Sequence, residues 1–204
     1  MRTRERGVAL VSALVLLLAG MLLALSAGRM AVGLLVSVEH ERDRAVARAA
    51  ATAALHDAAR DVDGAGGAAR AAVMIAAGAL VDGCGAGPVD RGLCKEADPP
   101  AWRVIDLAAA APQAAPYGFA TGAAMALGGA VLPARLPVYL VERLAAEDGL
   151  YRITAAGYGT RTATLVVLQA RYRRAAPGRM AWREIPDWFE LHARAGRADT
   201  GGER

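Results

Sequence analysis

Two cysteines, Cys84 and Cys94, have the clearest chemical potential in this chain of 204 residues. They lie in a loop that also contains glycine and proline. A zinc site needs about four nitrogen or sulfur ligands at set spacings, and the three histidines at positions 40, 56 and 192 are too scattered to complete one. In an exported protein the natural interpretation is a disulfide that closes the loop. The alternative is two reduced thiols in a cytosolic loop.

No pairing of a nucleophile with a base stands out, and the GxSxG, HExxH and P-loop motifs are absent. The segment from Asp61 to Gly64 resembles the start of a calcium loop, but its later ligand positions hold Ala, Gly and Arg, so a helix C-cap is the better interpretation. Asp82 and Asp90 in the cysteine loop are a weaker candidate for a cation site. We expect no catalytic residue, no metal and no cofactor, and therefore no enzyme.

The bond between Gly7 and Val8 is a candidate site of proteolytic processing. It separates a leader with three arginines, residues 1–7, from an uncharged apolar run over residues 8–28. A secretory signal peptide usually has a shorter apolar core and a better small-x-small cleavage site. An uncleaved signal anchor fits the length and the charges. A cut after Gly7 would instead leave the apolar helix at the new N-terminus of the chain.

The apolar run predicts a transmembrane helix over residues 8–28, because a helix of that length covers about 30 Å, the thickness of a bilayer core. The basic leader would stay in the cytoplasm, and the C-terminal domain would be periplasmic, giving a single-pass inner-membrane protein. Residues 29–63 lack proline and carry charges at helical spacing, so they predict an amphipathic continuation of the same helix. Glycines at 64, 66 and 67 would end it.

The net charge of +4 and the pI of 9.5 do not indicate a nucleic-acid protein. The basic residues are spread along the chain instead of forming one patch, and Arg42, Arg44 and Arg48 alternate with acidic residues. This pattern is typical of a solvated helix face. We therefore expect no nucleic acid among the partners.

Residues 64–174 predict a globular domain. Alternating segments at 102–107, 137–144, 150–156 and 162–172 are candidate strands, and glycine-containing turns separate the last three. Residues 108–132 are rich in Ala and Gly and predict an irregular loop. Short connections favour an antiparallel sheet, whose apolar face would pack on the exported half of the long helix in an α+β fold.

Residues 175–204 form a C-terminal extension. Trp182, Ile185, Trp188, Phe189 and Leu191 lie among charges and could form a short amphipathic helix after a proline. One interpretation is a segment that docks a partner or lies at a membrane interface. The other is a frayed tail with one packed turn.

Several of these segments resemble the PilX-type minor pilins of type IV pilus assembly. The similarity covers about residues 4–174, and the order and spacing of the motifs carry it. The matching segments are RERGVALVSALVLLLAGMLLALSA at the start, Arg42-Asp43-Arg44 with the Ala-rich residues 50–57, Gly92-Leu-Cys94 with Pro99, Pro100 and Trp102, and the segments 139–143, 150–154, 157–159, 166–169 and 172–174. Thr52 departs from the family, which usually has glutamate there.

The resemblance implies a pilin-like fold and cleavage after Gly7 by prepilin peptidase, with N-methylation of Val8. It also implies a place in a tip or priming complex with other minor pilins and the major pilin, and a tip adhesin is a further candidate partner. Ser12 stands where most pilins carry a glutamate, a lack that suits a subunit at the tip. K-type pseudopilins of type II secretion share this lack but are usually longer. The other alternative is a generic single-pass, membrane-anchored periplasmic binding protein.

Overall fold

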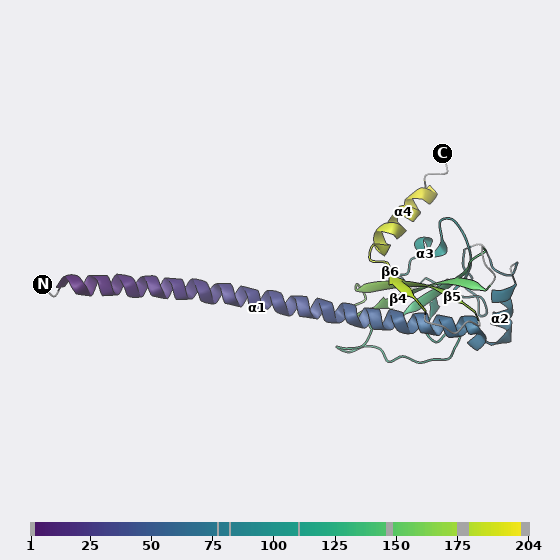
Figure 1. The fold of residues 1–204 in the computed structure, drawn as a ribbon, viewed down its shortest axis with the longest axis horizontal. Helices are drawn as coiled ribbons and strands as arrows, with labels where there is room; N and C mark the ends of the chain where they lie inside the picture. The colour runs from purple at the N-terminus through teal and green to yellow at the C-terminus, as the bar shows by residue number, and fades with distance from the viewer. Residues whose placement is uncertain are drawn as a thin grey trace. The chain divides into compact units, whose positions relative to one another are not determined.

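The computed structural model describes residues 3–76, 78–81, 83–109, 111–145, 149–174 and 180–200. Within these ranges, the side chains of residues 3–9, 27–36 and 198–200 lie outside the description. The chain divides into two units, Met1–Arg42 and Asp43–Arg204, which are considered separately. The second unit contains a sheet with helices on both sides, so its fold is α+β (Figure 1).

Helix α1 runs from Thr3 to Arg60 because nothing in this stretch breaks it. The first proline of the chain is Pro88, and the C-terminal part of the helix is rich in alanine, the residue with the highest helix propensity. A wide turn, η1 (Asp61–Ala65), follows, in which Gly64 has φ 105°, a conformation that glycine adopts at little cost. The chain therefore leaves the helix where the glycines predicted its end, and α2 (Gly67–Ile75) begins there.

Three antiparallel strands form the centre of the sheet. β3 (Val138–Arg143), β4 (Leu150–Tyr158) and β5 (Leu165–Arg173) follow one another along the chain and pair in that order. They overlap the three segments whose alternation predicted strands. The edge strand β6 (Trp182–Glu184) pairs antiparallel with β5. Residues 182–184 of the C-terminal extension are therefore part of the sheet.

The other edge makes the sheet mixed instead of antiparallel. β1 (Leu93–Lys95) pairs in parallel with β3, and β2 (Ala115–Pro116) pairs antiparallel with the other half of the same strand. A parallel pair needs a long crossover connection, and residues 96–137 provide it. The prediction of an antiparallel sheet is therefore wrong. Strands of two and three residues are too short to produce a recognisable alternation.

One face of the sheet packs against the C-terminal part of α1. This helix presents an almost entirely alanine surface, with these fully buried residues: Ala47, Ala51, Ala54, Leu55 and Ala58. Gly157 on β4 allows the close approach, since a Cβ atom there would lie 2.1 Å from the carbonyl oxygen of Ala47. The sheet thus lacks a side chain at the point where the backbone of the helix comes closest.

Asp43 joins α1 to the turn between β4 and β5. Its carboxylate accepts hydrogen bonds from the backbone N–H (2.5 Å) and hydroxyl (2.7 Å) of Thr160 and from the hydroxyl of Thr164. Burial raises the pKa of Asp43, but the hydrogen bonds from Thr164, Thr160 and Arg161 together outweigh burial, so the net pKa lies below its usual value. The ionised carboxylate is therefore the form that this turn stabilises.

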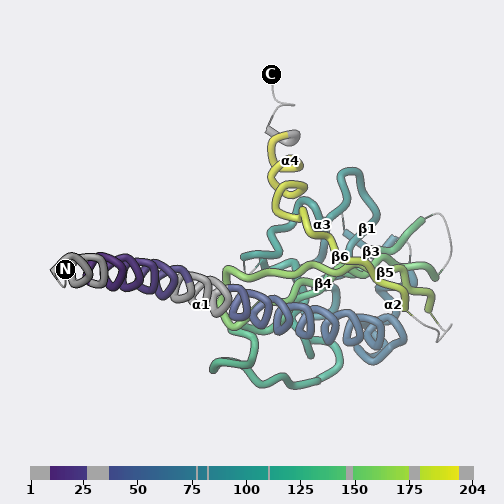
Figure 2. Tube along the Cα trace, turned by 60° about the vertical axis from the view of Figure 1, so that its left-hand side comes forward, coloured from purple at the N-terminus to yellow at the C-terminus, as the bar shows by residue number. Residues whose placement is uncertain are grey.

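On the opposite face of the sheet lie α3 (Ala101–Val104) and α4 (Trp188–Thr200), of which Trp188 and Leu191 join the apolar core. Figures 1 and 2 show α4 on this side of the sheet, with its C-terminal end directed away from it. Trp188 is buried between the two helices, and its indole Nε1 donates a hydrogen bond of 2.8 Å to the carbonyl oxygen of Trp102. The predicted strand at 102–107 is therefore wrong. Residues 101–104 form a helical turn instead, and Trp102 is buried in the same apolar cluster as Trp188.

The prediction of a transmembrane half of the long helix is contradicted. Among the described residues, no helix combines the length and the apolar character that a membrane span requires. The expected single-pass inner-membrane location, with a periplasmic C-terminal domain, depended on that span and is therefore not supported either.

Candidate functional site

The N-terminal unit exposes an unusual amount of apolar surface. Its large apolar side chains between positions 10 and 25 are all more than half exposed: Leu10, Val11, Leu14, Val15, Leu16, Leu17, Leu18, Met21, Leu22, Leu23 and Leu25. Exposed contiguous apolar surface of this kind marks a site of interaction. The residues lie on successive turns of one helix, so they offer a continuous rod of aliphatic side chains.

The three sequence-predicted sites near the N-terminus lie on this same helix. Gly7 and Val8 fall inside the bounds of α1, and their side chains are outside the described residues. Ser12 is described and exposed, one turn before Leu16 within the apolar rod.

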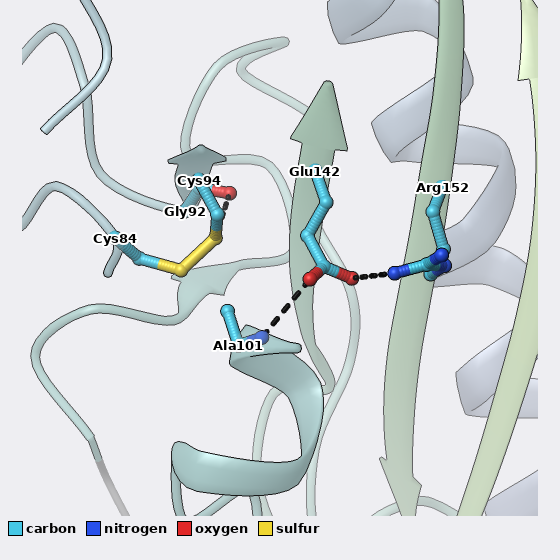
Figure 3. The surroundings of a disulfide bond; sticks show 6 residues. All are labelled: Cys84, Gly92, Cys94, Ala101, Glu142 and Arg152. Carbon is cyan, nitrogen blue, oxygen red and sulfur yellow. Dashed lines mark hydrogen bonds and ion pairs between the residues drawn. A yellow bond between two sulfur atoms is a disulfide. The ribbon is translucent and has the colours of Figure 1, made fainter. Parts of the chain in front are cut away.

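The structure contains a disulfide between Cys84 and Cys94, the pair that the sequence analysis linked (Figure 3). Cys94 lies on β1 and is fully buried, and the two cysteines also form an isolated β-bridge. The backbone N–H of Gly85 donates to the carbonyl oxygen of Leu93 at 3.0 Å. The loop is thus closed by a covalent bond and by main-chain hydrogen bonds, and its C-terminal end is fixed to the sheet.

An ion pair between the buried Glu142 and the partly buried Arg152 lies next to the disulfide (Figure 3). Glu142 Oε1 accepts a hydrogen bond of 3.0 Å from the backbone N–H of Ala101, at the start of α3, and Oε2 lies 3.6 Å from Arg152 Nη1. Burial is the largest influence and raises the pKa of Glu142, although Arg152 and the Ala101 N–H oppose it. This carboxylate attaches α3 to β3.

Sequence reasoning missed this pair. Glu142 and Arg152 are ten positions apart and meet only because β3 and β4 pair with these residues directly opposite each other. The alternation of the two segments placed each residue on a face of a strand. Only the register of the two strands, which alternation does not reveal, shows that these two residues lie opposite each other.

The acidic residues considered for cations have structural partners instead. Asp61 is paired with Arg70, Asp63 accepts a hydrogen bond of 2.6 Å from the hydroxyl of Tyr172, and Asp90 accepts one of 2.7 Å from the N–H of Gly87. Asp82 lies outside the described residues. Within the part of the chain that the structure describes, no group of three or more His, Cys, Asp or Glu side chains is arranged to hold a metal ion.

The three histidines remain separate in the fold. His40 and His56 are exposed on α1, and His192 on α4 is stacked on Trp188, with Nδ1 2.7 Å from the carbonyl oxygen of Arg103. None of them faces a carboxylate or hydroxyl in a way that suggests a nucleophile and a base. Their positions fit packing and surface roles.

Comparison of the chain with models of protein families, with curated proteins and with solved structures gives no match. The resemblance to PilX-type minor pilins therefore rests on the sequence motifs themselves and stays a prediction.

Proposed function

We propose that this chain is a minor pilin, a structural and assembly subunit of a type IV pilus that works in the tip or priming complex. The observation that carries the proposal is the aliphatic rod of α1, whose large side chains between Leu10 and Leu25 are more than half exposed. A rod of this kind has a use if it packs among equivalent helices of neighbouring subunits. The other minor pilins and the major pilin are the partners that the motifs imply.

The globular unit supports the proposal in a different way. Its sheet holds the alanine face of α1 by close backbone contact, while the disulfide fixes the preceding loop to β1. Such a unit is a rigid carrier for a helix that assembles with others. Its described residues contain no metal-binding group, so the work of the protein would be done by its surfaces.

The rest of the proposed assembly pathway follows from the resemblance. Prepilin peptidase would cut between Gly7 and Val8, and Val8 would become the methylated N-terminus. Ser12 leaves the rod without the carboxylate that a neighbouring subunit would have to neutralise, because an unpaired charge in an apolar contact is costly. A subunit of this type fits a terminal position, where a tip adhesin would be a further neighbour.

The processing step is tested by the intact mass of the protein isolated from its native host without reductant. We expect a chain that begins at N-methylated Val8 and lacks two hydrogens at Cys84 and Cys94. A chain that retains residues 1–7 in assembled filaments would contradict the proposal.

The assembly step is tested by replacing an exposed rod residue with a charge. Leu17, which is 74% exposed, is changed to Asp, and Val104 on α3, which is 51% exposed, is changed to Asp as the matched control. Leu17→Asp should abolish incorporation into sheared pili because it places a charge among packed aliphatic side chains. Val104→Asp should leave incorporation unchanged. Equal incorporation of both variants would contradict the role of the rod.

A further inference from the structure

A cleft of about 650 Å³ opens on the face of the sheet opposite α1. Its walls come from α3 and from strands β4, β5 and β6. Four arginines line it together with Gln169 and Trp102: Arg103, Arg152, Arg171 and Arg183. None of the described residues that line it is acidic. The volume falls within the range of about 300–1,000 Å³ that is usual for small-molecule sites.

The register of the sheet gathers these basic side chains. Arg152 on β4 lies directly opposite Arg171 on β5, and Gln169 on β5 lies directly opposite Arg183 on β6. Residues directly opposite on neighbouring strands have Cβ atoms about 5 Å apart, and like charges in such a pair destabilise the sheet. The fold therefore holds two positive charges side by side.

Only part of this positive charge is neutralised by the chain. Among the described residues, Arg152 alone of the four arginines has a carboxylate partner, Glu142, at 3.6 Å. The partners of two others are neutral: Arg183 Nη2 donates to Gln169 Oε1 at 3.0 Å, and the guanidinium of Arg103 lies over the ring of Trp102 at 4.9 Å. The cleft keeps an excess of guanidinium groups.

We propose that this arginine cleft is a binding site for a polyvalent oxyanion, a small molecule that carries two or more phosphate or carboxylate groups. The planar guanidinium group presents paired N–H donors that match both oxyanions, and neighbouring guanidinium groups can share one ligand. The cleft is larger than a single inorganic anion requires, and Trp182, which is 42% exposed, and Pro100 provide an apolar wall for a carbon skeleton. This site does not depend on the proposed role in a pilus.

Binding is measured by isothermal titration calorimetry on the full-length chain in a non-ionic detergent at low salt. Pyrophosphate and citrate are the two polyvalent probes, and acetate is the monovalent control. We expect saturable binding of at least one polyvalent probe and none of acetate, with affinity that falls as salt is added. Tighter binding of pyrophosphate identifies a phosphate ligand, and tighter binding of citrate identifies a carboxylate ligand.

The variants Arg171→Gln and Arg183→Gln should each lower the affinity for the bound probe about tenfold, because each removes one charge-assisted contact. Arg194→Gln is the matched control, since its side chain is 66% exposed on α4 and pairs with Glu190 on the helix surface. It should change the affinity less than twofold. Thermal unfolding of each variant checks that the fold is intact.

The absence of saturable binding for both polyvalent probes would overturn the proposal. Wild-type affinity in both cleft variants would overturn it as well. Equal weakening by Arg194→Gln would show that the probe responds to the net positive charge of the protein and not to the cleft.

Discussion

Arg70 on α2 binds both carboxylate oxygens of Asp61 in the turn after α1. Its Nε lies 2.8 Å from Oδ1 and its Nη2 lies 2.7 Å from Oδ2, and both side chains are at least 97% buried. Tyr139 on β3 donates a further hydrogen bond of 3.1 Å to Oδ2, and Arg70 Nη1 donates to the carbonyl oxygen of Val89. One ion pair thus joins the end of α1, the start of the next helix, the sheet and the cysteine loop.

Replacing Arg70 with Met should lower the free energy of unfolding by about 3–5 kcal/mol, because Asp61 would remain buried without its counter-charge. The double variant Asp61→Asn, Arg70→Met should recover part of this loss, since neither charge of this pair then remains buried. Urea unfolding of wild type, of the single variants Arg70→Met and Asp61→Asn, and of the double variant gives the coupling energy of the pair. In the exposed pair of Glu190 and Arg194, Arg194→Met should cost less than about 1 kcal/mol. A similar cost at both sites would contradict the role of burial.

Gly157→Ala should destabilise the globular unit by about 3 kcal/mol, since the new methyl group would meet the backbone of α1 at Ala47 and Ala51. Backbone atoms cannot move aside as a flexible side chain can, so the helix would shift away from the sheet. Gly196→Ala on α4 is the control. A Cβ there meets nothing within 4 Å, and alanine should raise stability by about 0.5–1 kcal/mol. Thermal unfolding distinguishes the two outcomes, and a neutral effect at Gly157 would show that the contact is looser than described.

Trp188→Ala should cost about 3–5 kcal/mol, because this side chain is 1% exposed and fills the space between α3, α4 and the sheet. Phe189→Ala, at the next position, should cost less than about 1 kcal/mol because its ring is 54% exposed. Denaturant unfolding measures both. If the two changes have equal effects, α4 is not anchored through Trp188.

The pH dependence of stability should change when Glu142 is replaced with Gln. The pKa of Glu142 is raised in the folded protein, mainly by burial, so its contribution to stability is greatest below the ordinary value of 4.5 and is lost as the pH rises through the folded pKa. Glu142→Gln keeps an oxygen acceptor for the Ala101 N–H. Because glutamine does not ionise, the variant does not lose stability at this position as the pH rises. The melting temperature of the variant relative to wild type should therefore increase as the pH is raised from about 4 to 8.

Asp43→Asn is the control of opposite sign. The net pKa of Asp43 is lowered, so its contribution is present above the ordinary value of 3.8 and disappears as the pH falls through the folded pKa. This variant should be less stable than wild type at neutral pH, and the gap should narrow in acid. Parallel pH profiles for wild type and both variants would contradict the assignment of either shift.

The central strands could be predicted from the sequence because their alternation is local information. Val138, Leu140 and Glu142 fall on one face of β3, as the period of two requires. The short segment at 102–107 misled the same rule, because Trp102 is buried in a cluster that includes Trp188, a residue far along the chain. Local patterns could not show that contact.

The candidate sites also differ in whether the sequence alone could predict them. The aliphatic rod and the pair of cysteines can be read directly from composition and position. The arginine cleft could not be predicted, because Arg152, Arg171 and Arg183 come from three strands and meet only once their registers are set. The parallel pairing of β1 with β3 depends on the long connection between them in a similar manner.

The alanine surface of α1 has a consequence for how this protein tolerates change. At Ala47, Ala51, Ala54 and Ala58 the side chain is already the smallest that still favours a helix, and each of these positions has no exposed surface. A substitution there either adds atoms to a filled contact or introduces glycine, which weakens the helix. An alanine also has no rotamers to lose when the helix docks, so this contact forms without side-chain entropy loss on the helix side. The contact between helix and sheet therefore forms with little loss of side-chain entropy and tolerates few substitutions at these positions.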